Sequence, residues 1–162
     1  MRAAITGHLV LSTLHTNDAV SAIDRLSDIG IEPYMTSAAL KGVISQRLVR
    51  KICPNCREAY TPDVDELKAL GIENTEGVQF YRGAGCAECR HTGYNGRQAV
   101  FEILTITKEM RRAIANGASS EEILPIALQG NYEPMKKACA KLTLKGITTA
   151  EEAIKAVNST VE

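Results

Sequence analysis

Two Cys-x-x-Cys pairs constrain the fold of this chain more than any other feature of its sequence. The first pair is Cys53 with Cys56, the second is Cys86 with Cys89, and the chain has five cysteines in all. A gap of two residues lets both sulfurs of a pair reach one metal ion at adjacent tetrahedral positions, about 2.3 Å from it. Two such pairs fill the coordination shell. The spacing therefore predicts a structural site of four thiolates, with no open position for a substrate.

Other interpretations of these cysteines remain open in the sequence. Disulfide bonds are one, although a chain of 162 residues can bury an ordinary core without them. Iron takes the same four thiolates, but zinc is the commoner occupant of a closed structural site. His91 is a further candidate ligand, although four thiols already complete the shell. Basic residues near the two pairs are candidates to balance the negative charge of the thiolates: Arg50, Lys51, Arg57, Arg90 and Arg97.

The charge composition argues against a nucleic-acid-binding zinc ribbon. Lys plus Arg number 19 and Asp plus Glu number 19, so the formal net charge is zero and no global field attracts a polyanion. The longest apolar runs, such as residues 9–11, are far too short to span a bilayer, and the chain does not open like a signal peptide. We therefore expect a cytoplasmic protein with reduced cysteines, no nucleic acid partner and no direct membrane insertion.

The N-terminal part of the sequence predicts an α/β arrangement. Residues 7–15 form an apolar run with a polar end, which is typical of a parallel strand buried on both faces. An amphipathic helix follows, capped within residues 16–18 and ended by Gly30, and Pro33 begins a second helix expected to reach about Leu48. One buried strand needs neighbours on each side, so we expect the remaining sheet to come from upstream sequence or a partner chain.

The rest of the chain predicts two strands and then a helical tail. Asp63 with Glu66 caps a short helix, and residues 77–82 and 96–104 are expected to be strands that frame the second cysteine pair. Cys139 lies among apolar residues of the tail and is expected to be a buried core thiol. The expected tail helices begin at Thr107, at Ser119 with Glu122, at Pro134, and at Thr148 with Glu151.

Four stretches of the sequence closely resemble one protein family. Residues 6–19, TGHLVLSTLHTNDA, are similar to the histidine box of the secretion ATPases that drive type II secretion and type IV pilus assembly. Residues 46–57, QRLVRKICPNCR, and residues 93–102, GYNGRQAVFE, resemble the zinc-bearing C-terminal segment of the assembly ATPases. Residues 146–152, GITTAEE, are similar to the last helical motif of that family. The resemblance covers essentially the whole chain.

The resemblance implies a fold and a domain organisation. Residues 1–50 would be the C-terminal edge of a RecA-like P-loop NTPase domain, residues 51–104 an inserted tetracysteine zinc lobe, and residues 105–162 a C-terminal helical bundle. The family carries a Walker A loop and a Walker B acid, which bind phosphates and magnesium. This sequence contains neither pattern, and both are expected upstream of Met1. We therefore expect no catalytic residue in this chain and no ATP hydrolysis by the chain alone.

The resemblance also implies a site and partners. His8 and His15 would face the nucleotide, although packing at the start of a strand explains His8 equally well. Arg25 and Arg47 would lie near the nucleotide too, although pairing with surface carboxylates explains these two charges at least as well. Zinc would be structural, and ATP with Mg²⁺ would bind only in a complete subunit. The implied partners are other ATPase subunits in a hexamer and an inner-membrane platform or cytoplasmic-ring protein, which would hold the chain in the cytoplasm or at the inner membrane. The implied residues near the nucleotide are His8, Thr13, His15, Asn17, Arg25 and Arg47.

Two functions of other classes compete with this interpretation. A stand-alone zinc-binding adaptor would dock a membrane partner through the cysteine lobe without using ATP. A nucleic-acid-binding ribbon would bind through basic side chains, and its binding would weaken steeply with salt. Those side chains would be Arg47, Arg50, Lys51, Arg57 and Arg90. A catalytic zinc enzyme is disfavoured, because four thiolates leave no open coordination position.

Overall fold

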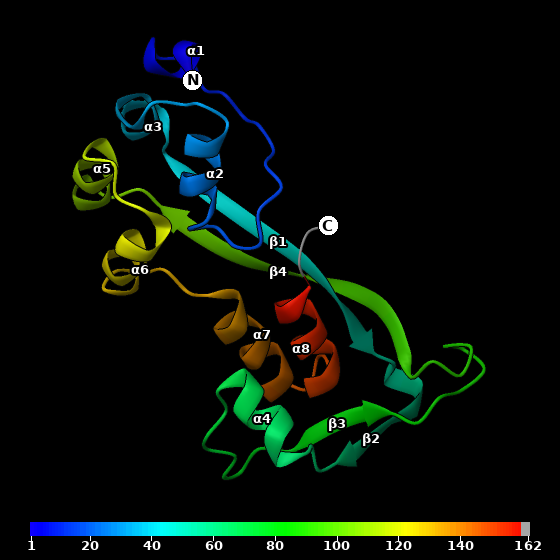
Figure 1. The fold of residues 1–162 in the computed structure, drawn as a ribbon. Coiled ribbons are helices and arrows are strands. Elements are labelled where there is room, and N and C mark those ends of the chain that lie inside the picture. The colour runs from blue at the N-terminus through cyan, green and yellow to red at the C-terminus, as the bar shows by residue number, and fades with distance from the viewer. Residues whose placement is uncertain (160–162) are drawn as a thin grey trace. The chain divides into compact units, whose positions relative to one another are not determined.

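The computed structural model describes residues 1–159, which form two compact units of mixed α/β structure (Figure 1). The first unit contains Met1–Ser45 and Glu102–Glu133, and the second contains Gln46–Phe101 and Pro134–Ser159. Each unit has a hydrophobic core of its own. The chain therefore passes between the units several times, and neither unit is one continuous segment.

A two-stranded antiparallel sheet of β1, Gly42–Ile52, and β4, Tyr94–Thr105, contributes residues to both units (Figure 1). The N–H of Ile106 donates to the carbonyl of Lys41 at 3.0 Å, just beyond one end of the pair. The N–H of Cys53 donates to the carbonyl of Gly93 at 2.9 Å beyond the other end. This pairing joins segments that lie about fifty residues apart in the sequence.

The prediction of one helix from Pro33 to about Leu48 is wrong in its second half. Helix α3 covers Pro33–Ala39 only, and β1 begins at Gly42. The side chains of β1 alternate between exposed and more buried as far as Val49, which is the period of a strand. The apolar spacing before Leu48 suits both the period of a helix and the period of a strand. Pairing with the distant strand β4 decides between the two.

The first unit packs five helices around the ends of the two strands. They are α1, Arg2–Ile5; α2, Ala22–Asp28; α3; α5, Lys108–Ala115; and α6, Ser120–Leu128. Leu104 of β4 and Ile123 of α6 are fully buried in its core. The apolar stripe of α2 predicted by the sequence is confirmed, because Ala22, Ile23 and Leu26 are buried.

Residues 8–16 form neither helix nor strand in this structure, so the predicted strand over residues 7–15 is not observed. Residues 8–15 are exposed, and Leu9 and Leu11 keep 86% and 88% of their surface accessible. An apolar run becomes a strand only where another strand satisfies its backbone groups. The two sheets in residues 1–159 are β1 with β4 and β2 with β3, and neither includes this stretch.

The second unit places three helices beside a short hairpin. Strand β2, Arg57–Tyr60, pairs antiparallel with β3, Phe80–Gly83, in the register Arg57 to Gly83 and Tyr60 to Phe80. The helices α4, α7 and α8 contact one another (Figure 1). Phe80, Cys139 and Ala153 are buried in the shared core, which confirms Cys139 as a core thiol. The helices cover Val64–Leu70, Met135–Leu144 and Ala150–Asn158.

Most of the predicted helix starts are confirmed, because a cap is a local interaction. Asp63 and Ser119 each begin a capping box, and Thr107 accepts a hydrogen bond from the N–H of Met110. Two predicted caps are wrong. Helix α2 begins at Ala22 with Ser21 at its N-cap, not within residues 16–18. Thr149 rather than Thr148 caps α8. Thr148 instead donates its hydroxyl proton to the carbonyl of Arg50 at 2.8 Å.

The tail is helical as expected, but a single bundle of its four helices is not confirmed. Helices α5 and α6 belong to the first unit, while α7 and α8 belong to the second. Within residues 1–159, every helix is too short or too polar to cross a lipid bilayer.

A buried carboxylate fastens α8 to the sheet of the second unit. Glu152 is 8% exposed and accepts hydrogen bonds from the backbone N–H of Arg50 at 3.0 Å and from its Nε and Nη2 at 3.0 and 2.6 Å. The Arg50 guanidinium lowers the pKa of Glu152 below its ordinary value of 4.5. The charged carboxylate therefore stabilises the folded chain above that pH, and this contribution disappears as the pH falls through the lowered pKa.

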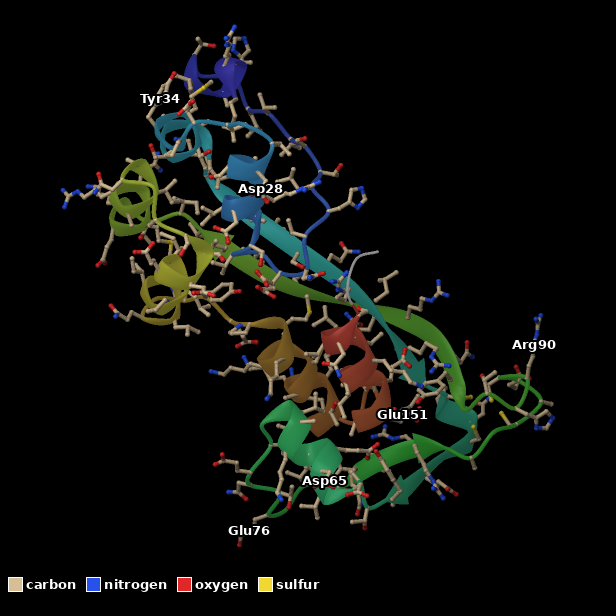
Figure 2. The ribbon with its side chains drawn as sticks, viewed as in Figure 1. Asp28, Tyr34, Asp65, Glu76, Arg90 and Glu151 are labelled. Carbon is tan, nitrogen blue, oxygen red and sulfur yellow. The ribbon has the colours of Figure 1, made fainter. Side chains whose placement is uncertain are left out.

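Replacing Glu152 with Gln should lower the free energy of unfolding at pH 7 by about 1 to 2 kcal/mol, because hydrogen bonds to a charged group are lost. The decline in stability on acidification below about pH 5 should become shallower than in the wild type. Urea unfolding followed by circular dichroism across this pH range measures both effects. The control is Glu151→Gln, since Glu151 is exposed (Figure 2) and pairs with Lys155 on the surface. An unchanged acid sensitivity in Glu152→Gln would contradict the assignment.

Candidate metal centre

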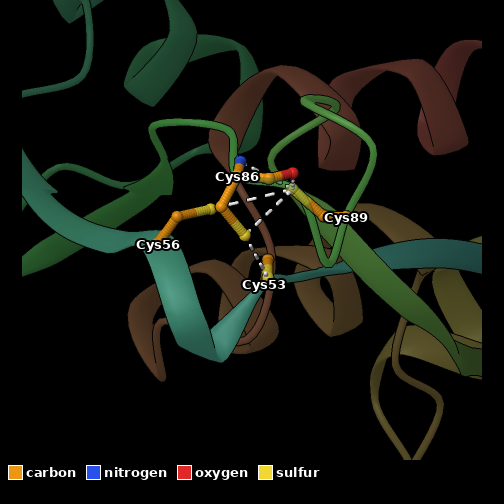
Figure 3. A group of neighbouring side chains, drawn as sticks. All are labelled: Cys53, Cys56, Cys86 and Cys89. Carbon is orange, nitrogen blue, oxygen red and sulfur yellow. Dashed lines mark hydrogen bonds between the residues drawn. The ribbon is translucent and has the colours of Figure 1, made fainter.

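The four cysteines of the two Cys-x-x-Cys pairs come together in the second unit (Figure 3). Cys53 directly follows β1, and Cys56 ends the short 3-10 turn η1, Pro54–Cys56. Cys86 and Cys89 lie in the loop between β3 and β4. All four sulfurs lie within 4.8 Å of one another, with Cys53 and Cys89 buried and the other two half-buried.

The sulfur separations match the edges of a tetrahedron around one ion. The distances are 3.9 Å from Cys53 to Cys86, 3.8 Å from Cys56 to Cys89 and 3.7 Å from Cys86 to Cys89. Four sulfurs about 2.3 Å from a central ion are about 3.8 Å apart. A disulfide bond is about 2.05 Å long, so the geometry does not support the disulfide interpretation. The donor set fits a soft divalent metal ion in a closed shell.

Backbone amides, which carry partial positive charge, surround two of the sulfurs. Sγ of Cys89 accepts the N–H of Cys86 at 3.2 Å and that of Gly93 at 3.3 Å. These bonds, chiefly the one from Cys86, lower the pKa of Cys89 to about 6. Sγ of Cys56 accepts the N–H of Gly85 at 3.2 Å, but burial raises the pKa of Cys56 to about 12. A bound divalent ion favours the thiolate form at every ligand.

Two of the basic residues expected to balance the thiolates, Arg50 and Arg57, contact aromatic rings in this structure. The guanidinium of Arg57 stacks 3.6 Å from the centre of the Tyr81 ring, and that of Arg50 lies 4.1 Å from the Tyr94 ring. Arg90 projects from the tip of the loop between β3 and β4 (Figure 2). The backbone N–H groups of Gly85, Cys86 and Gly93 do donate to the sulfurs.

The turn after the second pair has an unusual backbone. Arg90 and His91 have φ angles of 52° and 61°, the left-handed region that non-glycine residues seldom adopt. The turn is held by the N–H of His91, which donates to the carbonyl of Cys86 at 2.8 Å. His91 is exposed and is not among the residues that form the sulfur cluster. Its place in the sequence suggested a ligand, whereas its role in the turn comes from its backbone.

Gly83 and Gly93 flank the loop that holds Cys86 and Cys89, and their backbones approach each other closely beside the first cysteine pair. A Cβ atom added at Gly83 would lie 2.0 Å from the carbonyl oxygen of Gly93, and one at Gly93 would lie 2.5 Å from that of Gly83. Gly93 also accepts the N–H of Cys53 and donates its own N–H to Cys89. The approach of these two backbones therefore sets the distance between the cysteine pairs.

The six residues expected near a nucleotide are divided between the two units. Thr13 and His15 lie in the exposed stretch before α2, and Asn17 and Arg25 are exposed as well. The ring of His8 lies 3.2 Å from the carbonyl of Ala3, in the turn after α1. Arg47 belongs to the second unit, where its Nη2 donates to the carbonyl of Ser159 at 2.9 Å. Their assignment to a nucleotide site stays a prediction.

The sequence interpretation missed a buried polar pair in the first unit. Glu102 of β4 is 2% exposed, and its carboxylate accepts hydrogen bonds from the hydroxyl of Tyr132 and from the N–H of Ala19. The alternation of Glu102 with Val100 and Leu104 places it on the buried face of a strand. A carboxylate at an inward position of such a pattern is the signal that could have identified it.

The fold and the cysteine cluster define a mixed α/β protein with four cysteines placed so that they could hold one metal ion. The family described as Type II/IV secretion system protein matches residues 1–155. The chain is 47% identical to the type IV pilus assembly ATPase PilB of Thermus thermophilus over 94% of its own length, and 41% identical to the type II secretion system protein E of Pseudomonas aeruginosa over 96%. The chain belongs to this family of secretion and pilus assembly ATPases.

A solved structure resembles the chain as well. The pilus retraction motor PilT with bound ADP superposes with a TM-score of 0.60 and 26% sequence identity, over 98% of this chain and 35% of that one. The chain spans 17% of the length of PilB and 31% of that of the Pseudomonas protein. The comparisons thus relate the chain to one part of much longer proteins.

Replacing Gly83 with Ala should destabilise the metal centre by about 2 kcal/mol or more, because the added Cβ meets backbone atoms that must move. The expected result is a lower unfolding temperature of the metal-loaded chain and weaker metal retention against a chelator. Gly130→Ala is the matched control, since a Cβ there makes an ordinary contact at 3.5 Å. Equal metal retention in the two variants would show that the glycine contact does not set the site.

Proposed function

We propose that this chain is the C-terminal part of a secretion or pilus-assembly ATPase, which contributes a zinc lobe and a nucleotide-facing edge to a complete subunit. The family match over residues 1–155 carries this proposal. The chain itself lacks the two phosphate-binding patterns, so we expect it to hydrolyse no ATP in isolation. In the complete subunit it would belong to a motor that powers type II secretion or type IV pilus assembly.

The exposure of the stretch before α2 supports a role within a larger subunit. Leu9 and Leu11 are among the most exposed apolar side chains in residues 1–159, and Val10 is 47% exposed. An apolar run this accessible is typical of a surface that another segment or chain covers. We infer that residues 7–15 form a strand of a RecA-like sheet when the other strands of that sheet are present.

The same stretch would face the nucleotide. Polar groups at the carboxyl end of a strand lie where open α/β sheets bind ligands, which favours His15, Thr13 and Asn17. The imidazole of His15 can donate a hydrogen bond to a terminal phosphate oxygen, as can the amide of Asn17. His8, Arg25 and Arg47 are weaker candidates, because local packing or surface pairing explains them equally well.

Zinc is the proposed occupant of the cysteine cluster. Four thiols with tetrahedral separations form a closed structural site, for which zinc is the usual ion. The lobe that contains the site would dock an inner-membrane platform or cytoplasmic-ring protein, while the ATPase edge would contact neighbouring subunits of a hexamer. The proposed location is the cytoplasm, or the inner membrane surface through these partners.

Chain purified without added metal should contain about one zinc ion per molecule by elemental analysis. Cys56→Ser should lose most of this zinc and much of the stability of the second unit, because metal binding and folding are coupled in such lobes. Cys139→Ala, which removes a core thiol outside the cluster, should keep its zinc. Iron in place of zinc would change the identity of the bound ion but keep the metal site. A metal-free chain that is fully folded would contradict the assignment of a metal site.

The mass and N-terminal peptide of the endogenous protein, captured from its native host and measured by mass spectrometry, should show an extension upstream of Met1. We expect that extension to contain a Gly-x-x-x-x-Gly-Lys-Ser/Thr loop, because the relatives are much longer than this chain. A mature protein that begins at Met1 and lacks the loop would contradict a role as part of an active subunit.

A stand-alone zinc adaptor is the second candidate function. The second unit holds all four cysteines and its own hydrophobic core, which favours a module that folds and docks by itself. The adaptor would bind a membrane-platform protein without nucleotide. Tight binding of ATP by the purified chain would argue against it.

A further inference from the structure

The buried carboxylate of Glu102 joins two segments that are distant in the sequence. Its Oε1 accepts the backbone N–H of Ala19 at 3.1 Å and a hydrogen bond from the hydroxyl of Tyr132. A carboxylate that is only 2% exposed is costly to keep unless donors compensate for the lost water. Both of these donors are therefore held firmly, and all three residues belong to the first unit.

The Ala19 contact fixes the end of the exposed histidine-bearing stretch. Asp18 folds the chain into a turn, accepting the N–H and the hydroxyl of Ser21 at 2.7 Å each, and its carbonyl accepts the hydroxyl of Thr16 at 2.9 Å. Those bonds are local to the turn. The Ala19 to Glu102 bond ties the turn to strand β4, and Ala19 is itself fully buried.

Tyr132 connects the same carboxylate to the segment between α6 and α7. Its ring packs against the core of the first unit, and the residue lies next to Glu133, where the chain leaves that unit. Burial and the hydrogen bond to Glu102 raise the pKa of Tyr132, so its hydroxyl keeps its proton and acts as a donor. Glu102 likewise lies where β4 enters the first unit.

We propose that Glu102 and Tyr132 are positioning residues that together hold the Asp18–Ala19 turn, and thereby set where His15 and Asn17 point. This inference rests on the proposed nucleotide-facing role of that stretch, which would make its position matter for contact with a terminal phosphate. A displacement of Tyr132 or of its segment would loosen the turn through the shared carboxylate. The segment before α7 would then influence the histidine stretch without touching a nucleotide.

A purely structural role for the pair predicts a different response to substitution. Loss of a core contact weakens the whole unit, so all of its slowly exchanging amides open together. Loss of a positioning contact loosens the turn and its neighbours while the rest of the core stays protected. Hydrogen exchange measured residue by residue by NMR on the 162-residue chain separates the two cases.

The variants are Glu102→Gln, which makes the acceptor neutral, and Tyr132→Phe, which removes one oxygen and keeps the ring. Each should speed the exchange of the Ala19 amide, by about tenfold for Glu102→Gln, since hydrogen bonds to charged groups are the stronger ones. The amides of α5 should stay within about twofold of the wild type. The ring signals of His15 should shift, while those of His8, held in a separate turn, should not. Tyr34→Phe, at an exposed tyrosine of α3 (Figure 2), is the matched control.

Two results would overturn the inference. One is an Ala19 amide that exchanges within about twofold of the wild-type rate in either variant. The other is an equal acceleration throughout the first unit, which would mean that the pair only supports the core. The proposed function has a separate test in the complete endogenous subunit, to which ATP with Mg²⁺ is added. NMR ring signals of His15 that do not change on this addition would contradict the nucleotide-facing role. That outcome would leave the exchange result at Ala19 intact.

Discussion

The antiparallel pairing of β1 with β4 is the constraint on which the rest of the structure depends. It brings Cys53, at the end of β1, to the backbone of Gly93, which in turn contacts the second cysteine pair. The same pairing orients β4 so that Val100, Glu102 and Leu104 face inward. Both the cysteine cluster and the buried carboxylate of the first unit are therefore consequences of this strand pair.

Each unit contains a buried glutamate that links segments far apart in the sequence. Glu152 joins α8 to the backbone and guanidinium of Arg50, and Glu102 joins the turn before α2 to Tyr132. An apolar residue at either place would bury easily but would specify no partner. A carboxylate that has lost water requires particular donors, so these two residues select one arrangement of their neighbours.

The candidate metal centre depends on backbone geometry as much as on its four cysteines. The left-handed residues Arg90 and His91 reverse the chain, and Gly93 directs an N–H at Cys89. The close contact of Gly83 with Gly93 leaves no room for a side chain. A thiol cluster with tetrahedral spacing thus requires a turn of defined shape. The left-handed backbone of that turn is strained, and the contacts that hold it offset the cost.

The sequence by itself determined the features that arise from neighbouring residues. The caps at Asp63, Thr107 and Ser119 are correct because their hydrogen bonds close within three residues, and each Cys-x-x-Cys pair is a local pattern of the same length. Only the tertiary structure decided the features that need distant partners. Residues 8–16 are not a strand where no neighbouring strand is present, and β1 replaces the predicted end of a helix because β4 pairs with it. Local hydrogen bonds are encoded in short patterns, whereas strand pairing and buried charge depend on the whole fold.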